Sequence, residues 1–337
     1  MAGAVLYRLH FRSPLHIGER GVGLEETRTH VPADTLFSAL CTAWRWLYGV
    51  DSLRNDLLSP FLNAEQPPFL LTSAFPFAGD ILFFPKPSAL KGREEEEKLK
   101  KVRYISQGVL SWWVQTGNPL DTNGMCLASD GAFLVGKTEW QALEPFIDDE
   151  TSDVALWRVA VVPRVTLDRQ TSASQIWFFG QVAFKKNAGL WCAIRYRDEG
   201  LRHRAEACLR LLGDSGLGGE RGSGFGLFAV EVSEMVSLPE AEEAGYCVTL
   251  SPCCPTAQQI QTLIDDRCAY DLLPRRGWIG SPEGGNLRRK SVWMLSEGSV
   301  LRWTNGAVPG CLVNVKPEPC PHDVWRYGYA FPLGVRV

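Results

Sequence analysis

The sequence predicts an α+β protein made of two ferredoxin-like blocks, and three observations support that fold class. The chain has 337 residues, which is enough for about two domains at ~150 residues each. Apolar residues make up 45% and charged residues 22%, so a mostly disordered or collagen-like chain is excluded. Segments with strand and helix periodicity follow one another in the order strand, helix, strand, strand, helix, strand.

The first block is predicted to span residues 1–235. It opens with an alternating strand at 5–11, and helical spacing then predicts a helix over 35–48. Asp34 stands directly before this helix, where an N-cap belongs. Two short strands are expected next, at 69–75 and 81–84, separated by a Gly-Asp turn.

Residues 88–155 have the composition of an insertion on a compact core. The segment 91–113 has high helical propensity, and its mixed charge run is typical of a solvated helix face. The segment 116–152 is polar and irregular.

The rest of the first block contains four predicted strands and one helix. Residues 186–189 have the composition of a hairpin loop joining the second and third of these strands. The predicted elements are strands at 157–166, 175–185 and 190–197, a helix at 201–212, and a strand at 225–232.

The second block is predicted to span residues 240–337, after a boundary rich in Ser, Pro and Glu at 233–245. No sequence repeat relates the two blocks, so the duplication rests on element order alone. The predicted elements are strands at 246–250, 268–273 and 291–297, a helix at 256–266, and short strands to the end.

The ten cysteines are scattered and form no CxxC pair. Neither a signal peptide nor a run of ~18 apolar residues is visible, so we expect a cytoplasmic protein with reduced thiols and no cofactor. Cys247, Cys253, Cys254 and Cys268 are close in sequence, but their spacing fits no standard zinc pattern. A metal cluster there stays an alternative.

The formal net charge of −3 excludes a strongly basic nucleic-acid binder but permits a local basic face. Residues 271–290 hold five Lys or Arg against two acids, and residues 191–210 hold five Arg against three acids. Arg158, Arg164 and Arg169 form a third basic group. These segments predict a basic groove.

The glycine-rich run at 216–226 is the strongest local signal, since six of its eleven residues are glycine. A Walker A loop is excluded because no Gly-Lys-Ser or Gly-Lys-Thr ends the run. A dinucleotide fingerprint needs a strand before and a helix after the glycines, and here that order is reversed. Backbone N–H groups exposed by glycine, together with Arg221, favour a loop along a phosphate backbone. A flexible surface loop is the alternative.

This run resembles the glycine-rich loop of the RAMP superfamily of CRISPR proteins. Further segments resemble, in order, motifs of the fourth Csm subunit of type III-A effector complexes, between about residues 5 and 333. These segments are 30–40 (HVPADTLFSAL), 72–77 with 84–87, 163–171 (PRVTLDRQT), 290–300 and 324–331. The insertion matches nothing in that family.

The resemblance implies two RAMP domains and a non-catalytic subunit in antiviral defence. Members of the family grip the repeat-derived 5′ handle of the CRISPR RNA. They dock on the large polymerase-like subunit and on the repeating backbone subunit. On this basis we expect the insertion to supply a thumb-like hairpin against the guide. The type III-B counterpart stays open as a close relative.

We predict RNA contacts in the motifs that carry the resemblance. Among aromatic residues near the basic segments, only Phe225 is expected to face a base, while most of the others, which include Trp177, Phe179 and Trp278, are expected in the core. The predicted contacts are His16, Gly18, His30, Asp34, Thr35, Arg164, Thr166, Arg169, Thr171, Gly216, Gly218, Gly219, Arg221, Gly222, Ser223, Gly224 and Phe225.

Three other functions stay open. His16 and His30 could be the acid and base of a metal-independent CRISPR RNA processing endonuclease, or they could be structural. A metal-dependent nuclease would depend on Asp34 or Asp168. A protein scaffold that touches no nucleic acid is the third, and Arg221→Glu tests it.

Overall fold

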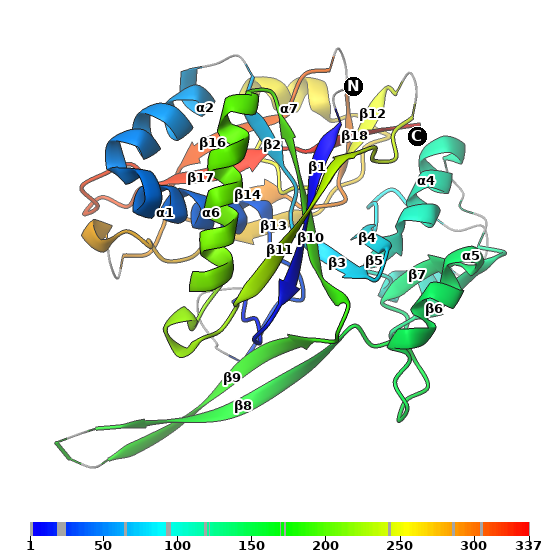
Figure 1. The fold of residues 1–337 in the computed structure, drawn as a ribbon. Helices are drawn as coiled ribbons and strands as arrows, with labels where there is room; N and C mark the ends of the chain where they lie inside the picture. The colour runs from blue at the N-terminus through cyan, green and yellow to red at the C-terminus, as the bar shows by residue number, and fades with distance from the viewer. Residues whose placement is uncertain are drawn as a thin grey trace.

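The fold is described from a computed structural model of the chain, shown in Figure 1. It covers residues 3–18, 25–63, 66–91, 96–117, 120, 122–168, 170–171, 173–241, 244–284, 287–303 and 306–336. None of the helices within these ranges combines the length and hydropathy needed to cross a bilayer.

A nine-stranded sheet forms the centre of the molecule. Its strands are β1 (Ala4–Phe11), β2 (Phe69–Leu71), β3 (Phe75–Ala78), β4 (Ile81–Pro85), β5 (Tyr104–Ser106), β6 (Met125–Ala128), β7 (Phe133–Gly136), β10 (Ala188–Tyr196) and β11 (Phe228–Val236). The order across the sheet is β11-β1-β10-β3-β4-β5-β7-β6, and β2 also pairs with β10.

The strands β11, β1, β10 and β2 have the antiparallel 4-1-3-2 order of a ferredoxin-like unit. Strand β1 lies between β11 and β10, with Tyr7 opposite both Cys192 and Val232, and five of its eight residues are buried. The predicted α+β, ferredoxin-like RAMP fold class is confirmed.

Helices α1 (Ala33–Ser52) and α6 (Arg202–Ser215) lie side by side on one face of this unit (Figure 1). One face of α6 is apolar and buried, including Cys208, Leu209 and Leu212. Helix α1 extends beyond its predicted ends and continues, after a non-helical Gly49, into a π-helical turn (Leu53–Leu58) and α2 (Ser59–Asn63).

The insertion extends the sheet instead of projecting from it. Besides β5, β6 and β7 it contains α3 (Glu96–Lys101), α4 (Gln107–Thr116), α5 (Lys137–Trp140) and a 3₁₀ turn (Gln141–Phe146). The segment 91–113, which has high helical propensity, contains α3 and the start of α4, but β5 interrupts it and is buried between β4 and β7. Ser106 then caps α4 by accepting from the backbone N–H of Val109.

The projecting hairpin comes from the segment after the insertion, so the expectation of a thumb-like insertion is wrong. Strands β8 (Trp157–Leu167) and β9 (Ser174–Phe184) pair with each other along their full length and extend away from the body (Figure 1). The predicted hairpin between the second and third strands of this region is also wrong. After β9 the chain enters the central sheet, where β10 pairs with β1, β2 and β3.

The C-terminal half is a smaller β-rich layer. Its elements are β12 (Tyr246–Thr249), α7 (Ala257–Leu263), β13 (Leu272–Arg275), β14 (Val292–Leu295), β15 (Val300–Arg302), β16 (Gly310–Asn314), β17 (Trp325–Tyr329) and β18 (Pro332–Val335). The sheet β15-β12-β18 has the 3-1-4 order of a reduced ferredoxin-like unit, while β13-β14 and β16-β17 form separate pairs. Short 3₁₀ turns lie at Glu199–Leu201, Arg221–Ser223 and Pro282–Gly284.

The two halves share one hydrophobic core, and we call their contact the seam. Strand β17 packs on α1, with the rings of Phe37 and Tyr327 5.1 Å apart. The hydroxyl of Tyr327 accepts from the backbone N–H of Leu71 at 2.9 Å, and the hydroxyl of Tyr329 donates to the carbonyl of Phe61 at 3.0 Å. The boundary predicted at 233–245 overlaps the end of β11, which continues to residue 236.

Candidate nucleic-acid interface

The glycine-rich loop follows α6 and packs against the segment after β1. Gly216 ends the helix with φ +86, and Gly218 has φ +91. A Cβ at Gly218 would lie 2.3 Å from the carbonyl oxygen of His16, so only glycine allows this close approach. By contrast, a Cβ at Gly222 or Gly224 would meet nothing within 4 Å. The start of the loop is therefore held by close backbone contact, whereas the space around Gly222 and Gly224 is open.

Several backbone N–H groups of the loop donate to protein carbonyls. Gly219 donates to His16 at 3.0 Å, Ser223 donates to Glu220 at 2.9 Å, and Gly226 donates to Pro14 at 2.8 Å. These three N–H groups are therefore not available to a phosphate. The loop instead presents the exposed side chain of Arg221, whose guanidinium carbon lies 6.0 Å from the ring centroid of Trp46.

His16 ties this loop to the projecting hairpin. Its ring is buried, lies 4.3 Å from the ring of Phe179, and its Nδ1–H donates to the carbonyl of Gly180 at 2.7 Å. The adjacent Gly18 and Gly219 pass close to the same ring. His16 therefore positions the loop and the base of the hairpin.

Phe225 is buried, so the prediction that it faces a base is wrong. Its ring packs edge-on against Phe179, with the ring centroids 5.1 Å apart. This apolar contact anchors the loop on the hairpin. The guanidinium of Arg164 covers the ring at 5.4 Å in a cation–π contact. Arg164 and Phe225 are therefore neighbours across the loop and the hairpin.

Asp34 is neither an N-cap nor an accessible RNA contact. The N-cap position is taken by Pro32, and the carboxylate of Asp34 is fully buried at the seam. Its oxygens accept from Arg275 Nε at 3.0 Å and Nη2 at 2.9 Å, and from Nη1 of Arg326. Burial alone would raise the pKa of Asp34, but Arg275 and Arg326 outweigh burial and lower it. Asp34 therefore joins the two halves.

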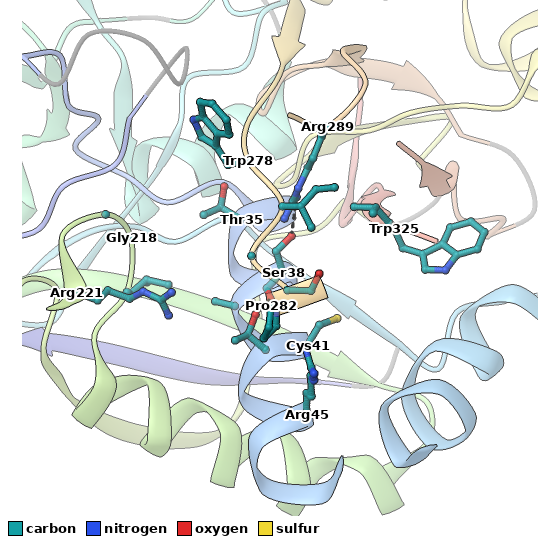
Figure 2. A pocket seen from close by; sticks show the side chains of 18 of the residues that line it. Thr35, Ser38, Cys41, Arg45, Gly218, Arg221, Trp278, Pro282, Arg289 and Trp325 are labelled. Carbon is teal, nitrogen blue, oxygen red and sulfur yellow. Dashed lines mark hydrogen bonds between the residues drawn. The ribbon is translucent and has the colours of Figure 1, made fainter. Parts of the chain in front are cut away.

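A cleft of about 520 Å³ opens where α1, the glycine-rich loop and the C-terminal half meet, and we call it the seam cleft (Figure 2). It brings together the predicted residues His16, Gly18, Thr35, Gly216, Gly218, Gly219 and Arg221. Arg45 closes one edge by a bidentate ion pair with Glu283, at 2.7 and 3.1 Å.

The other predicted contacts lie elsewhere. His30 lines a separate cavity of about 230 Å³, where Nδ1 lies 3.2 Å from the hydroxyl of Tyr104 and Nε2 lies 3.9 Å from Glu297. Thr166 and Thr171 are exposed toward the tip of the hairpin. Arg169 lies outside the described residues.

The hairpin has two chemically different faces. Residues paired across its ladder share a face, and one face is apolar yet exposed. Leu167 is 66% exposed and Ile176 is 64% exposed, far above core values. This face consists of Val159, Val161, Pro163, Val165, Leu167, Ile176 and Phe178. The opposite face carries Arg164 and Thr166 and meets the glycine-rich loop through Phe179.

Several residues that line the seam cleft were not predicted from the sequence, among them Ser38, Arg45, Trp46, Arg289 and Trp325. Arg289 lies in a segment singled out for its basic charge, and Trp46 continues the helix that follows Asp34. Trp46 is 54% exposed although it lies on a helix, which only the tertiary structure reveals. Trp278, assigned to the core, is also half exposed and lines the seam cleft.

The clustered cysteines lie in an apolar environment. Cys247 and Cys253 pack with Leu295, Leu301 and Ala330, and burial raises the pKa of both thiols. Within the ranges described above, no group of three or more His, Cys, Asp or Glu is arranged to hold a metal ion.

Comparison with known proteins agrees with this architecture. Residues 8–229 match the RAMP superfamily, and residues 242–335 match the CRISPR Csm4 C-terminal domain. The "CRISPR system Cms protein Csm4" of Thermococcus onnurineus (strain NA1) is 29% identical over 314 residues, covering 90% of this chain and 91% of that protein. The protein of the same name from Mycobacterium tuberculosis (strain CDC 1551 / Oshkosh) is 27% identical, covering 88% of this chain and 87% of its own.

Two solved structures share the fold. A chain of a "Csm3-Csm4 subcomplex in the type III-A CRISPR-Cas interference complex" superposes with a TM-score of 0.68 at 18% identity, covering 99% of this chain and 100% of that chain. A chain of a "Csm1-Csm4 cassette in complex with cA4" gives a TM-score of 0.61 at 22% identity, covering 99% and 98%.

The sheet order, the glycine-rich loop after α6 and the reduced second unit together define a RAMP-type protein with two ferredoxin-like halves. The chain belongs to the RAMP superfamily and, within it, to the Csm4 family of type III CRISPR systems.

Proposed function

We propose that this chain is a non-catalytic, RNA-binding subunit of a type III-A CRISPR interference complex that grips the repeat-derived 5′ handle of the CRISPR RNA. The observation that carries the proposal is the seam cleft. There the glycine-rich loop, the start of α1 and the C-terminal half converge on one hollow lined by arginine and tryptophan.

The lining of the seam cleft suits single-stranded RNA. Arg221 and Arg289 offer positive charge for phosphate groups, and the single acidic side chain in the lining, among the described residues, is Asp323. Trp46 and Trp278 are half exposed, so each can stack an unpaired base, worth ~1–3 kcal/mol per base. Handle RNA held there would also contact the exposed part of the glycine-rich loop.

The two faces of the projecting hairpin suit contact with RNA on one side and with a protein partner on the other. Its face with Arg164 turns toward the glycine-rich loop and would follow the RNA. Its other face exposes several large apolar side chains next to one another, as interaction surfaces do, so we assign it to the repeating backbone subunit. The large polymerase-like subunit is the second expected partner. Chains with this fold occur in a Csm3-Csm4 subcomplex and in a Csm1-Csm4 cassette, which supports both assignments.

Two alternatives lose support. A processing endonuclease that uses His16 and His30 as acid and base needs both rings at one substrate, but they line different cavities. Membership of the Csm4 family favours the type III-A subunit over its type III-B counterpart.

The test is a tagged pull-down from cells that carry the native CRISPR locus, with the bound RNA sequenced from its 5′ ends. We expect one short repeat-derived 5′ end and co-purification of the large subunit. Arg221→Glu should lower RNA retention without unfolding the chain. The control Arg302→Glu, at an exposed position on β15, should leave RNA retention unchanged. Absence of RNA from the wild-type pull-down, or trimming of repeat RNA by the isolated chain, would refute the proposal.

A further inference from the structure

Around Asp34, the seam gathers more guanidinium groups than carboxylates among the described residues. Three guanidinium groups, those of Arg275, Arg289 and Arg326, surround the buried carboxylate of Asp34. Arg275 and Arg326 donate hydrogen bonds directly to that carboxylate. Arg289 donates to the hydroxyl of Ser38 instead. Buried charges are normally paired. Among the described residues, three guanidinium groups act on the one carboxylate of Asp34.

Arg289 is the member of this group that lines the seam cleft. Its Nη1 donates to the hydroxyl of Ser38 at 3.1 Å, and its Nε has no hydrogen-bond partner among the described residues. Burial, together with the nearby Arg326, lowers the pKa of Arg289 to about 10. Arg289 is therefore a partly buried cation at the wall of an open cleft, and it makes fewer hydrogen bonds than Arg275.

The side chains beside Arg289 suit an anion. Thr35 accepts from Arg275 Nη2 at 2.9 Å, and Ser38 accepts from Arg289. Each hydroxyl therefore keeps its own O–H available for a ligand oxygen. Both residues belong to the first turns of the 20-residue helix α1, whose dipole favours negative charge at that end. Figure 2 shows Arg289 descending to Ser38 from the C-terminal half, with Thr35 alongside.

We propose that Arg289, Thr35 and Ser38 form a binding site for a single phosphate group of the RNA, and that this phosphate neutralises positive charge at the seam. The inference rests on the proposed function for the source of the phosphate. The proposed site has a further consequence: binding of a phosphate there strengthens the contact between the two halves. A phosphate fits better than a planar carboxylate because it offers oxygens to one guanidinium and two separate hydroxyls at once.

The test compares the full-length wild type with Arg289→Gln and with the matched control Arg302→Gln. Two probes are used: a labelled single-stranded RNA carrying the repeat sequence, and inorganic phosphate. We expect Arg289→Gln to lower RNA affinity about tenfold and to reduce the salt slope by about 0.7, as loss of one contact to single-stranded RNA should. Phosphate should raise the melting temperature of the wild type and the control, but not that of Arg289→Gln.

Without ligand, Arg289→Gln should melt at the same temperature as the wild type or higher, because it removes a partly buried positive charge that lies beside two other arginines. A merely structural arginine predicts the opposite, so lower stability with unchanged RNA affinity would overturn the inference. Arg289→Lys keeps the charge and should retain most of the binding, and it replaces the glutamine variant if that one does not fold.

The outcomes separate this inference from the proposed function. Tight RNA binding by the wild type that is unaffected by Arg289→Gln overturns the phosphate site and leaves the proposed function standing. A wild type that binds no RNA, yet is stabilised by phosphate only when Arg289 is present, overturns the proposed function and leaves the anion site standing. Arg289→Gln could instead weaken co-purification of the large subunit and leave the responses to RNA and phosphate unchanged. That result would show that a carboxylate of a protein partner binds Arg289, and it would overturn the inference.

Discussion

Replacing Asp34 by asparagine distinguishes two explanations of why an acid stands at the start of α1. An N-cap would contribute about 1 kcal/mol, which is the value that the sequence position predicts. In the structure the carboxylate instead accepts three hydrogen bonds from two buried arginines. Removing one partner of a buried ion pair leaves the other charge uncompensated and costs about 3–5 kcal/mol.

We therefore expect Asp34→Asn to lower the free energy of unfolding by about 3–5 kcal/mol. At ~2 °C per kcal/mol, a value for large domains, the melting temperature should fall by about 6–10 °C. The control is Asp214→Asn, which breaks an exposed ion pair with Arg12 at 3.0 Å and should cost under about 1 kcal/mol. The assay is urea unfolding of the three proteins at pH 7.

The pH dependence provides a second check. The pKa of Asp34 is lower in the folded chain than in the unfolded one, so its stabilisation is fully present above the unfolded pKa of ~3.9. It is lost as the pH falls through the folded value. The difference between wild type and Asp34→Asn should thus be constant from pH 5 to 8 and shrink only below ~4. If the two aspartate variants differ by less than about 1 kcal/mol at pH 7, the buried ion cluster does not hold the seam.

Three further outcomes follow from the site. Gly218→Ala should destabilise the glycine-rich loop by about 1–3 kcal/mol and reduce RNA retention, because its Cβ would lie 2.3 Å from a carbonyl oxygen. Gly222→Ala, with open space around its Cβ, should do neither, and equal effects would contradict the close-approach argument. Burial raises the pKa of Cys41 to about 12, so its alkylation at pH 8, followed by mass spectrometry, should be about a thousandfold slower than that of a free cysteine. A rate that levels off near pH 9 would refute this. Val165→Asp, on the apolar face of the hairpin, should leave the melting temperature unchanged but prevent co-purification of the backbone subunit, whereas Thr166→Asp on the other face should preserve it. Retention of that subunit by Val165→Asp would exclude this face as its docking surface.

The central unit could be predicted from local pattern because its elements are regular. Strand β1 alternates, α6 buries one apolar stripe, and the helix-loop-strand order around residues 216–226 excluded both nucleotide-cofactor motifs. The insertion could not be predicted in the same way. Its short strand β5 has weak periodicity and forms because β4 and β7 bury it on both sides.

The residues of the candidate site show the same distinction between local and long-range determinants. The glycine-rich loop and Arg221 were recognisable from the sequence because glycine content and charge are local properties. Phe225 and Asp34 were assigned wrongly, since burial depends on partners far along the chain: Phe179 for the ring, and Arg275 and Arg326 for the carboxylate.

The sequence by itself determined the fold class, the family resemblance and the loop that carries the interface. Only the tertiary structure decided which segment projects as a hairpin, which charges meet at the seam, and that Arg289 faces the cleft from the second half. These depend on contacts between residues more than 200 positions apart, such as Arg289 with Ser38. No local pattern specifies such contacts, because they form only when two separately patterned halves share one core.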